Sequence, residues 1–261
     1  MPTTTIHFIR HGKVYNPDHL LYERLPGFHL SDRGMRMAQA TGAYIAADPK
    51  LNAVAAVYSS SLERTRETAG AILDALNPVR AGRGEEPLEL ITDPRVIEAG
   101  NEFRGKRIGH GKGALWRDGN WKLVLNLWKP SWGESTGTSP TRGAFANERI
   151  REYAGRQIIV VSHESPIWSY RHLLETGHPE HWMFLRKTAL ASITSITYDS
   201  DTGKVMSITY ATLRRKSSEC GVRRPYNTQR GRLRARPRKG AHAARVGTDG
   251  GRVAVTCDDA A

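Results

Sequence analysis

The sequence predicts an α/β layered fold, and two observations support this prediction. Three runs of β-branched and other apolar residues, at 4–9, 53–58 and 157–162, are apolar enough to be buried on both faces of a sheet. The first two runs are followed by stretches, at 34–45 and 65–76, in which apolar or small residues recur on one face of a helix. Strands that alternate with helices along the chain are typical of a sheet packed against layers of helices.

Serine residues mark the expected beginnings of the helices. Ser31 and Ser61 precede the two helical stretches, and a serine hydroxyl can accept a hydrogen bond from the first turn of a helix. After the third strand, Ser165 is followed by Pro166, and proline is favoured in the first turn of a helix. We therefore expect all three serines to be N-caps.

Two further strands are expected near the end of the sheet. Alternating apolar residues at 191–198 and 205–210 are separated by the turn-forming run Asp199-Ser200-Asp201-Thr202-Gly203. Two alternating runs joined by such residues predict a β-hairpin. We expect this hairpin to supply the last strands of the sheet.

The long segment between the second and third strands lacks a sustained period. Residues 103–135 contain four tryptophans and are expected to cover the end of the sheet, where the indole rings would pack onto the core or contact a substrate. The composition of 133–143 predicts a loop, which leaves only 144–154 for a short helix of barely three turns. One face of the sheet is therefore expected to be poorly covered.

Charge is distributed unevenly along the chain. The 261 residues have a formal net charge of +13. Residues 213–261 contain 13 Lys and Arg against 4 Asp and Glu, which gives this stretch +9 and leaves +4 for residues 1–212. Because apolar periodicity stops near Leu213, we expect a domain over 1–212 and a basic, disordered tail over 213–261. Two origins fit the composition of the tail: a selected extension or a shifted reading frame.

The cysteines and the N-terminus bear on cellular location. Cys220 and Cys257 both fall in the tail, so residues 1–212 contain no thiol for a disulfide, a zinc site or thiolate catalysis. The N-terminus has no basic region followed by a long apolar run, and no window approaches about eighteen consecutive apolar residues. We expect neither a secretion signal nor a membrane span, and a cytoplasmic location.

Basic side chains follow the ends of the three central strands. Arg10 and His11 follow the first strand, Arg64 follows the second, and His163 follows the third. In open α/β sheets, ligands bind beyond the carboxyl ends of the strands, where the N-termini of helices attract anions. A single strand-end histidine is more often structural, and Arg64 alone would fit a solvated helix face. Their shared placement nevertheless predicts a pocket for a phosphate group.

At these positions the chain resembles the histidine phosphatase superfamily, whose phosphoglycerate-mutase-like members carry an RHG motif at the end of the first strand. Arg10-His11-Gly12 matches that motif. The resemblance covers residues 4–212 and includes Leu30-Ser31-Asp32-Arg33-Gly34 with Gln39-Ala40, SSSLERTRETA at 59–69, Val96-Ile97-Glu98 and VVSHESPIW at 160–168. It implies a three-layer α/β/α sandwich with a mostly parallel central sheet, as in phosphoglycerate-mutase-like proteins.

The resemblance also implies a role for each matched residue. His11 matches the nucleophile that becomes phosphohistidine, while Arg10, Arg64 and His163 match the groups that hold the phosphoryl oxygens. Glu98 matches the proton donor. Such chemistry requires no metal and no cofactor, because arginine forks bind phosphate oxygens and stabilise the charge of phosphoryl transfer. Guanidinium charge beside His11 would lower its pKa and keep the ring nucleophilic near neutral pH.

Two assignments stay open. Glu164 competes with Glu98, because a carboxylate directly after the second histidine is the donor in the acid-phosphatase branch of the superfamily. Glu164 would otherwise interact only with the N-terminus of the helix that follows, and we favour Glu98 because the chain resembles the smaller, mutase-like branch. Asn16 is a further candidate for substrate binding, one residue closer to RHG than the asparagine that contacts the phosphoryl group in many relatives.

The resemblance implies a phosphatase that hydrolyses small phosphomonoesters through a phosphohistidine intermediate. One alternative is a mutase, which returns the phosphoryl group to the same bound substrate and needs further substrate-specific basic groups; we identify no convincing set. Another is a catalytically degenerate protein that binds anions or nucleic acid through its tail by counterion release. Tyr226 is the only aromatic residue of the tail, so stacking on bases is not supported. We expect a small phosphorylated substrate and no membrane partner.

Overall fold

The computed structural model describes residues 1–100, 104–107, 138–178, 186–216 and 219–222. The helices are α1 (Asp32–Ala47), α2 (Glu63–Gly82), α4 (Thr138–Glu152) and α5 (Glu164–Thr176), with a short 3-10 helix, η1 (Pro94–Val96). The strands are β1 (Thr3–Arg10), β2 (Val54–Ser59), β3 (Leu90–Thr92), β4 (Gln157–Ser162), β5 (Ile193–Asp199), β6 (Val205–Ala211), β7 (Leu213–Lys216) and β8 (Glu219–Val222).

The first six strands form one sheet in the order β3-β2-β4-β1-β5-β6. β1, β2, β3 and β4 run parallel to one another, whereas β5 is antiparallel to both β1 and β6. The mostly parallel sheet, its three central strands and its terminal hairpin are therefore as predicted. The crossovers between the parallel strands are long enough to contain helices, whereas a short turn joins β5 to β6.

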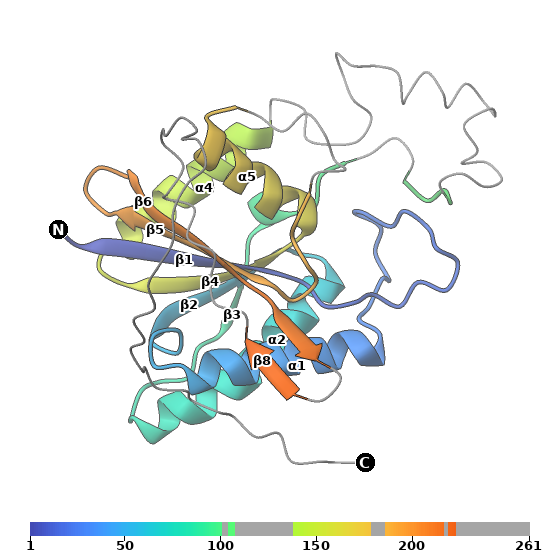
Figure 1. Cartoon of the computed structure of the whole chain (residues 1–261), viewed down its shortest axis with the longest axis horizontal. Coiled ribbons are helices and arrows are strands. Elements are labelled where there is room, and N and C mark those ends of the chain that lie inside the picture. The colour runs from blue at the N-terminus through green and yellow to red at the C-terminus, as the bar shows by residue number, and fades with distance from the viewer. Residues whose placement is uncertain (101–103, 108–137, 179–185, 217–218, 223–261) are drawn as a thin grey trace, which may run out of the picture.

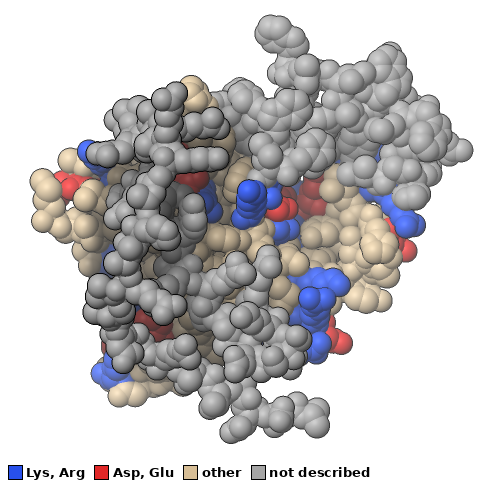
Figure 2. Space-filling model, in the orientation of Figure 1, with Lys and Arg blue, Asp and Glu red and all other residues tan. Residues whose placement is uncertain are grey.

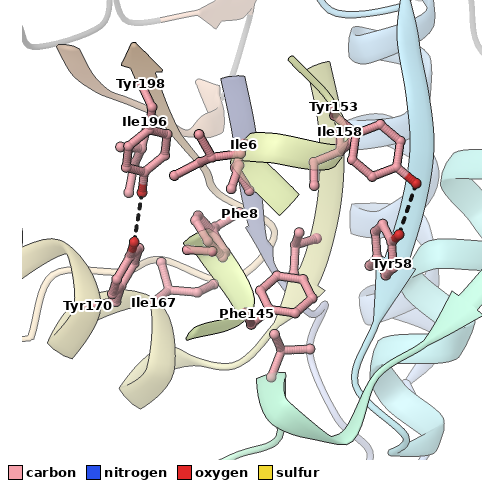
Figure 3. Close-up of a cluster of buried hydrophobic side chains, with 14 of the residues drawn as sticks. Ile6, Phe8, Tyr58, Phe145, Tyr153, Ile158, Ile167, Tyr170, Ile196 and Tyr198 are labelled. Carbon is pink, nitrogen blue, oxygen red and sulfur yellow. Dashed lines mark hydrogen bonds between the residues drawn. The ribbon is translucent and has the colours of Figure 1, made fainter. Parts of the chain in front are cut away.

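Helices cover both faces of the sheet, which gives the expected three layers (Figure 1). On one face, Ile6 and Phe8 of β1 pack in a cluster that includes Phe145 of α4 and Tyr170 of α5 (Figure 3). On the other face, Ile9 of β1 packs in a cluster with residues of α1 and α2. Successive side chains of a strand point to opposite faces, so burial of both faces explains the nearly continuous apolar runs of the central strands.

The helix beginnings agree only in part with the predictions. Ser31 is the N-cap of α1, and its Oγ accepts a hydrogen bond from the Gly34 N–H at 3.1 Å. The N-cap prediction for Ser61 is wrong: α2 begins after Leu62, which is buried and therefore holds that position through packing. The prediction for Ser165 is also wrong, because β4 leads through His163 directly into α5 and leaves Ser165 in the first turn.

Helix α4 is longer than the sequence suggests. It begins at Thr138, so the predicted loop over 133–143 is wrong for residues 138–143. Pro140 lies in the first turn, where backbone N–H groups have no partner within the helix and proline is tolerated. Buried side chains such as Phe145 and Ile150 stabilise this helix through tertiary packing, although its first residues are poor helix formers. The expectation of poor cover on this face is therefore wrong.

The expected cover formed by 103–135 lies outside the described residues except for 104–107. There the Lys106 carbonyl accepts a hydrogen bond from the Leu21 N–H at 3.0 Å, and the Gly105 N–H donates to the Leu21 carbonyl at 2.9 Å. This short segment therefore runs along the loop that follows β1. The four tryptophans between 103 and 135 all lie outside the described residues.

The chain after residue 212 begins with regular structure. β7 and β8 pair as an antiparallel hairpin that forms a sheet of its own. Backbone hydrogen bonds form this pairing, so the loss of apolar periodicity after Leu213 gave no sign of it. Residues 223–261 lie outside the described part of the chain. The boundary between a domain over 1–212 and a tail over 213–261 stays a prediction.

Charges of both signs are mixed on the part of the described surface that Figure 2 shows. On the face drawn in Figure 2, Lys and Arg side chains lie close to Asp and Glu side chains. This mixture agrees with the small net charge of residues 1–212. None of the helices in the described ranges is both long and apolar enough to cross a membrane.

Candidate active site

The carboxyl ends of β1, β2 and β4 are brought together by the register of the sheet. Val161 of β4 pairs with Ile9 of β1 on one side and with Ser59 of β2 on the other. Residues that immediately follow these positions therefore converge at one edge. They include His11 after β1 and His163 after β4, whose ring centroids are 5.2 Å apart in an edge-to-face arrangement.

The orientation of the His11 ring is fixed by the residue that follows it. The Nδ1 atom lies 2.7 Å from the carbonyl oxygen of Gly12, and the ring is buried. A carbonyl oxygen can only accept, so Nδ1 carries the hydrogen and donates it. The Nε2 atom of the neutral ring therefore holds a lone pair.

Burial and positive charge both favour the neutral form of His11. Burial lowers its pKa well below the usual 6.5, and the guanidinium groups of Arg64 and then Arg10 lower it further. The hydrogen bond to Gly12 opposes this shift but does not cancel it. The ring is consequently unprotonated at Nε2 near neutral pH, which is the state a nucleophile requires.

Arg64 lies in the first turn of α2 and is fully buried. Its Nη2 donates to the backbone carbonyl of Glu23, and its Cζ lies 4.8 Å from the centroid of the Tyr22 ring. Burial lowers the pKa of Arg64, but arginine remains charged at any physiological pH. A fixed positive charge is thus held against the loop that follows β1.

Several guanidinium N–H groups in the site have no hydrogen-bond partner among the described residues. They are Nε of Arg10 and both Nε and Nη1 of Arg64, and all three atoms are buried. Arg10 is held by its other end, where Nη1 donates to the Thr188 carbonyl at 2.5 Å and contacts Glu164 Oε1 at 2.9 Å. Buried charged donors are costly without an acceptor, so this arrangement suits a bound anion such as a phosphoryl group.

His163 and Glu98 face each other in the same site. The His163 Nε2 atom lies 2.9 Å from the hydroxyl oxygen of Ser60, and its Nδ1 atom lies 3.9 Å from Glu98 Oε2. The other carboxylate oxygen of Glu98 accepts a hydrogen bond from the Ala99 N–H at 2.9 Å. Glu98 is thereby oriented beside the second histidine, with its side chain 16% exposed.

The remaining two candidates have different surroundings. Glu164 pairs with Arg10, and its side chain is 33% exposed, twice the fraction of Glu98. The Asn16 side chain is bonded to its own loop: Nδ2 donates to the Leu20 carbonyl at 2.8 Å, and Oδ1 accepts from the Leu20 N–H at 3.1 Å. The role of Asn16 in substrate binding stays a prediction.

The loop between β1 and α1 is fastened to the first two turns of α2. Glu67 accepts hydrogen bonds from His29 and from the Leu30 N–H, and Glu63 accepts one from the Gly27 N–H at 3.1 Å. The charged residues beside Arg64, which sequence alone could place on a solvated helix face, therefore hold this loop in position. The loop in turn places Tyr22 against the Arg64 guanidinium.

Sequence reasoning missed Tyr22 and Ser60 as members of the site. The pKa of Tyr22 is raised mainly by burial and is influenced by Arg64, Arg10, Glu98 and Glu164, so its hydroxyl lies among the charged groups of the site. Nothing in the irregular segment around Tyr22 signals this position. Ser60 lies in the run SSSLERTRETA, and its place directly after a central strand was the available signal.

The described residues contain no group of three or more His, Cys, Asp and Glu side chains that could hold a metal ion. The ionisable side chains that converge at the edge of the sheet in the described part of the chain include two arginines, two histidines and two glutamates. This set can bind an anion, present a nucleophilic nitrogen and exchange a proton with a bound substrate.

Comparison with known proteins gives the family of the chain. A family model described as the histidine phosphatase superfamily (branch 1) matches residues 6–210. The uncharacterized protein Rv0525 of Mycobacterium tuberculosis is 40% identical over 200 residues, which cover 76% of this chain and 92% of that protein.

Two solved structures have the same fold. The mycobacterial glucosyl-3-phosphoglycerate phosphatase Rv2419c aligns with a TM-score of 0.59 at 19% identity, over 78% of this chain and 96% of that one. The phosphoglycerate mutase of Bacillus anthracis str. Sterne aligns with a TM-score of 0.59 at 19% identity, over 78% of this chain and 91% of that one. At this level of identity the likeness establishes the fold alone.

Proposed function

This chain belongs to branch 1 of the histidine phosphatase superfamily, and we propose that it hydrolyses small phosphomonoesters through a phosphohistidine intermediate. The observation that carries this proposal is the state of His11: Nδ1 donates to the Gly12 carbonyl, and burial with two guanidinium groups keeps Nε2 unprotonated. A neutral nitrogen with a lone pair, beside buried cationic donors, suits attack on phosphorus.

In the proposed first step, the N–H groups of Arg10, Arg64 and His163 hold the non-bridging oxygens of the phosphoryl group. His11 Nε2 attacks phosphorus, and the bond between phosphorus and the ester oxygen breaks. The leaving alkoxide takes a proton from the Glu98 carboxyl group. Positioning and charge stabilisation do most of the catalytic work in such a transfer, and the arginines supply that charge without a metal ion.

In the second step, Glu98 is ionised and accepts a proton from a water molecule. The water oxygen attacks phosphorus, and the bond from phosphorus to His11 Nε2 breaks. Inorganic phosphate leaves, His11 is again neutral, and Glu98 has regained its proton. The same carboxylate acts as acid in one step and base in the next, as microscopic reversibility allows.

The experiment that tests this proposal is a phosphomonoester panel with the purified full chain, with and without a chelator. We expect turnover that the chelator does not change. Quenched protein should carry phosphate that is labile in acid and stable in base. His11→Ala should lose both turnover and label, whereas the control His178→Ala should keep both, because His178 is exposed. Label that persists in His11→Ala would contradict the assignment of the nucleophile.

A further inference from the structure

We propose that Ser60 is a positioning residue that fixes which nitrogen of the neutral His163 ring carries hydrogen, so that Nδ1 donates to the phosphoryl group. This inference rests on the proposed function and extends it to a residue outside the groups that contact substrate. It follows from the two contacts of the buried Ser60 hydroxyl group and from which atom donates the hydrogen in each contact.

Ser60 is held rigidly at the end of β2. The residue is fully buried, and its N–H donates to the Val161 carbonyl of β4 at 3.1 Å. Its carbonyl oxygen accepts a hydrogen bond from the Thr65 hydroxyl at 2.9 Å, which ties it to the first turn of α2. These bonds fix the backbone of Ser60 between two elements that also carry residues of the site.

The hydrogen bond between Ser60 and His163 has a defined direction. The Ser60 Oγ atom accepts from the Leu62 N–H at 3.4 Å, and it lies 2.9 Å from His163 Nε2. The Leu62 N–H occupies only one of the two lone pairs of the oxygen, so the direction follows from the hydroxyl hydrogen instead. That buried hydrogen needs an acceptor, and His163 Nε2 is the only acceptor that the Ser60 hydroxyl contacts among the described residues. An unprotonated Nε2 is the acceptor of that hydrogen, which places the hydrogen of the neutral ring on Nδ1.

The other side of the His163 ring faces the reacting groups. Nδ1 lies 3.9 Å from Glu98 Oε2, and the ring stands edge-to-face against His11. His11, which follows β1, and Glu98, which follows η1, are the titratable groups seen against this ring among the described residues. The guanidinium groups of Arg64 and Arg10 act in turn on His11, and Glu164 of α5 contacts Arg10. A hydrogen on Nδ1 therefore points to the place where an anionic oxygen would be held.

Without the Ser60 hydroxyl, the ability of His163 Nδ1 to donate a hydrogen should depend on pH. In Ser60→Ala, the neutral ring is free to carry its hydrogen on Nε2, and Nδ1 would then present a lone pair to an anionic oxygen. When the ring is protonated on both nitrogens, Nδ1 donates in either protein. We therefore expect kcat/KM of Ser60→Ala to fall by about 10- to 100-fold at alkaline pH, the effect of losing a hydrogen bond to a charged group. The deficit should shrink towards acid pH.

Ser59→Ala is the matched control. Ser59 is the preceding residue, is equally buried, and donates its hydroxyl to the Ser60 carbonyl at 2.9 Å, not to a histidine. Its pH profile should keep the wild-type shape even if its stability falls. Ser60→Thr retains a hydroxyl and should restore the wild-type profile. A Ser60→Ala protein whose kcat/KM falls equally at every pH would overturn the proposal.

A spectroscopic measurement keeps the test independent of activity. The imidazole ¹⁵N signals of His163 in the full chain, identified by their loss in His163→Gln, should show hydrogen on Nδ1 above the pKa of the ring. Ser60→Ala should move hydrogen towards Nε2. Wild-type protein with hydrogen on Nε2 would refute the role of Ser60, whatever the activity. If no phosphomonoester is turned over but this signal is as expected, the proposed function fails and the role of Ser60 in fixing the ring survives.

Discussion

The two carboxylates of the site differ in their surroundings, and this difference bears on which one is the proton donor. Glu98 lies beside His163 and is oriented by the Ala99 N–H, whereas Glu164 is paired with Arg10. The contact with Arg10 holds the Glu164 carboxylate to a guanidinium group, whereas Glu98 lies beside the ring that would hold the phosphoryl group. The geometry therefore favours Glu98 as the acid.

Substitution of each carboxylate should distinguish them. We expect Glu98→Gln to lower kcat for alkyl phosphates by about 100-fold or more, the usual contribution of a general acid. Aryl phosphates with good leaving groups need little protonation and should be affected much less. Glu164→Gln should show no such contrast between substrates. Steady-state kinetics on one alkyl and one activated aryl phosphate would make the comparison, and the reverse pattern would move the acid to Glu164.

A third buried histidine, His7, lies in the middle of β1 away from the candidate site. Its Nδ1 is 2.7 Å from the Ser195 hydroxyl and its Nε2 is 2.8 Å from Gln157 Oε1, so the ring joins three neighbouring strands. Burial lowers its pKa below the usual 6.5, against the opposing effects of Gln157 and Asp48. The folded state is therefore more stable with His7 neutral than with His7 protonated.

This shift predicts how stability depends on pH. At a pH below about 6.5 the unfolded chain takes up a proton at His7 more readily than the fold does, so the free energy of unfolding should fall as pH decreases from 7 to 5. His7→Gln should make this decline less steep. His29, whose pKa is raised by Glu67, acts in the opposite direction but is present in both proteins. Urea unfolding at several pH values gives the slope of the unfolding free energy against pH for the wild type and for His7→Gln. Equal slopes would contradict the prediction.

Among the elements, α1 makes an unusually close contact with the segment that carries the nucleophile. A Cβ atom added at Gly34 would lie 1.9 Å from the Lys13 carbonyl oxygen, and one added at Gly12 would lie 2.4 Å from the Gly34 carbonyl oxygen. Real Cβ atoms do not approach backbone so closely. The two glycines therefore let the first turn of α1 lie directly against the backbone next to His11.

Gly34→Ala should force this helix away from the site. We expect the free energy of unfolding to fall by about 1–3 kcal/mol, as overpacking does, and kcat to fall by about 10- to 100-fold because His11 moves relative to its partners. Gly70→Ala in α2 is the control, because a Cβ there meets nothing within 4 Å. It should stabilise its helix by about 0.5–1 kcal/mol. Thermal unfolding and kcat of both variants decide the matter; unchanged kcat in Gly34→Ala would show that the contact is not required.

At the scale of the whole molecule, the six-stranded sheet is complete without the residues that follow β6. The hairpin of β7 and β8 forms a separate sheet, and an isolated hairpin contributes little stability in water. Residues 213–261 also account for +9 of the net charge of +13. The six-stranded sheet therefore lies in residues 1–212, whereas most of the net charge lies in residues 213–261.

A chain that ends at Thr212 should therefore keep its circular dichroism spectrum and any phosphatase activity. Any retention on DNA at low salt should be lost with the tail, since it depends on basic groups that release counterions. Brief trypsin digestion of the full chain should produce a similar fragment. Unfolding of the shortened chain would show that residues after 212 pack on the domain, and the predicted boundary would be wrong.

The sequence alone was sufficient for the α/β class, the central strands, the terminal hairpin and the grouping of Arg10, His11, Arg64 and His163. The hydrophobic period and the residues at strand ends can be identified from local sequence. Parallel strands bring their carboxyl ends to one edge of a sheet in any protein, so the grouping of the strand-end residues follows. The same local reasoning misplaced the N-caps of α2 and α5. It also predicted a helix that is too short at α4, because tertiary packing overrides the weak helix propensity of the first turn of that helix.

Only the tertiary structure decided how the site is oriented. Which nitrogen of His11 is free depends on the Gly12 carbonyl, and the neighbours of Glu98 and Glu164 come from elements far apart in the sequence. Tyr22 belongs to the site through a contact with Arg64 that no spacing along the chain could indicate, and the strand-end position of Ser60 did not reveal its contact with His163. Hydrogen-bond direction and distance between such groups depend on how the strands and helices pack, so the sequence determined which chemical groups meet and the fold determined what each can donate or accept.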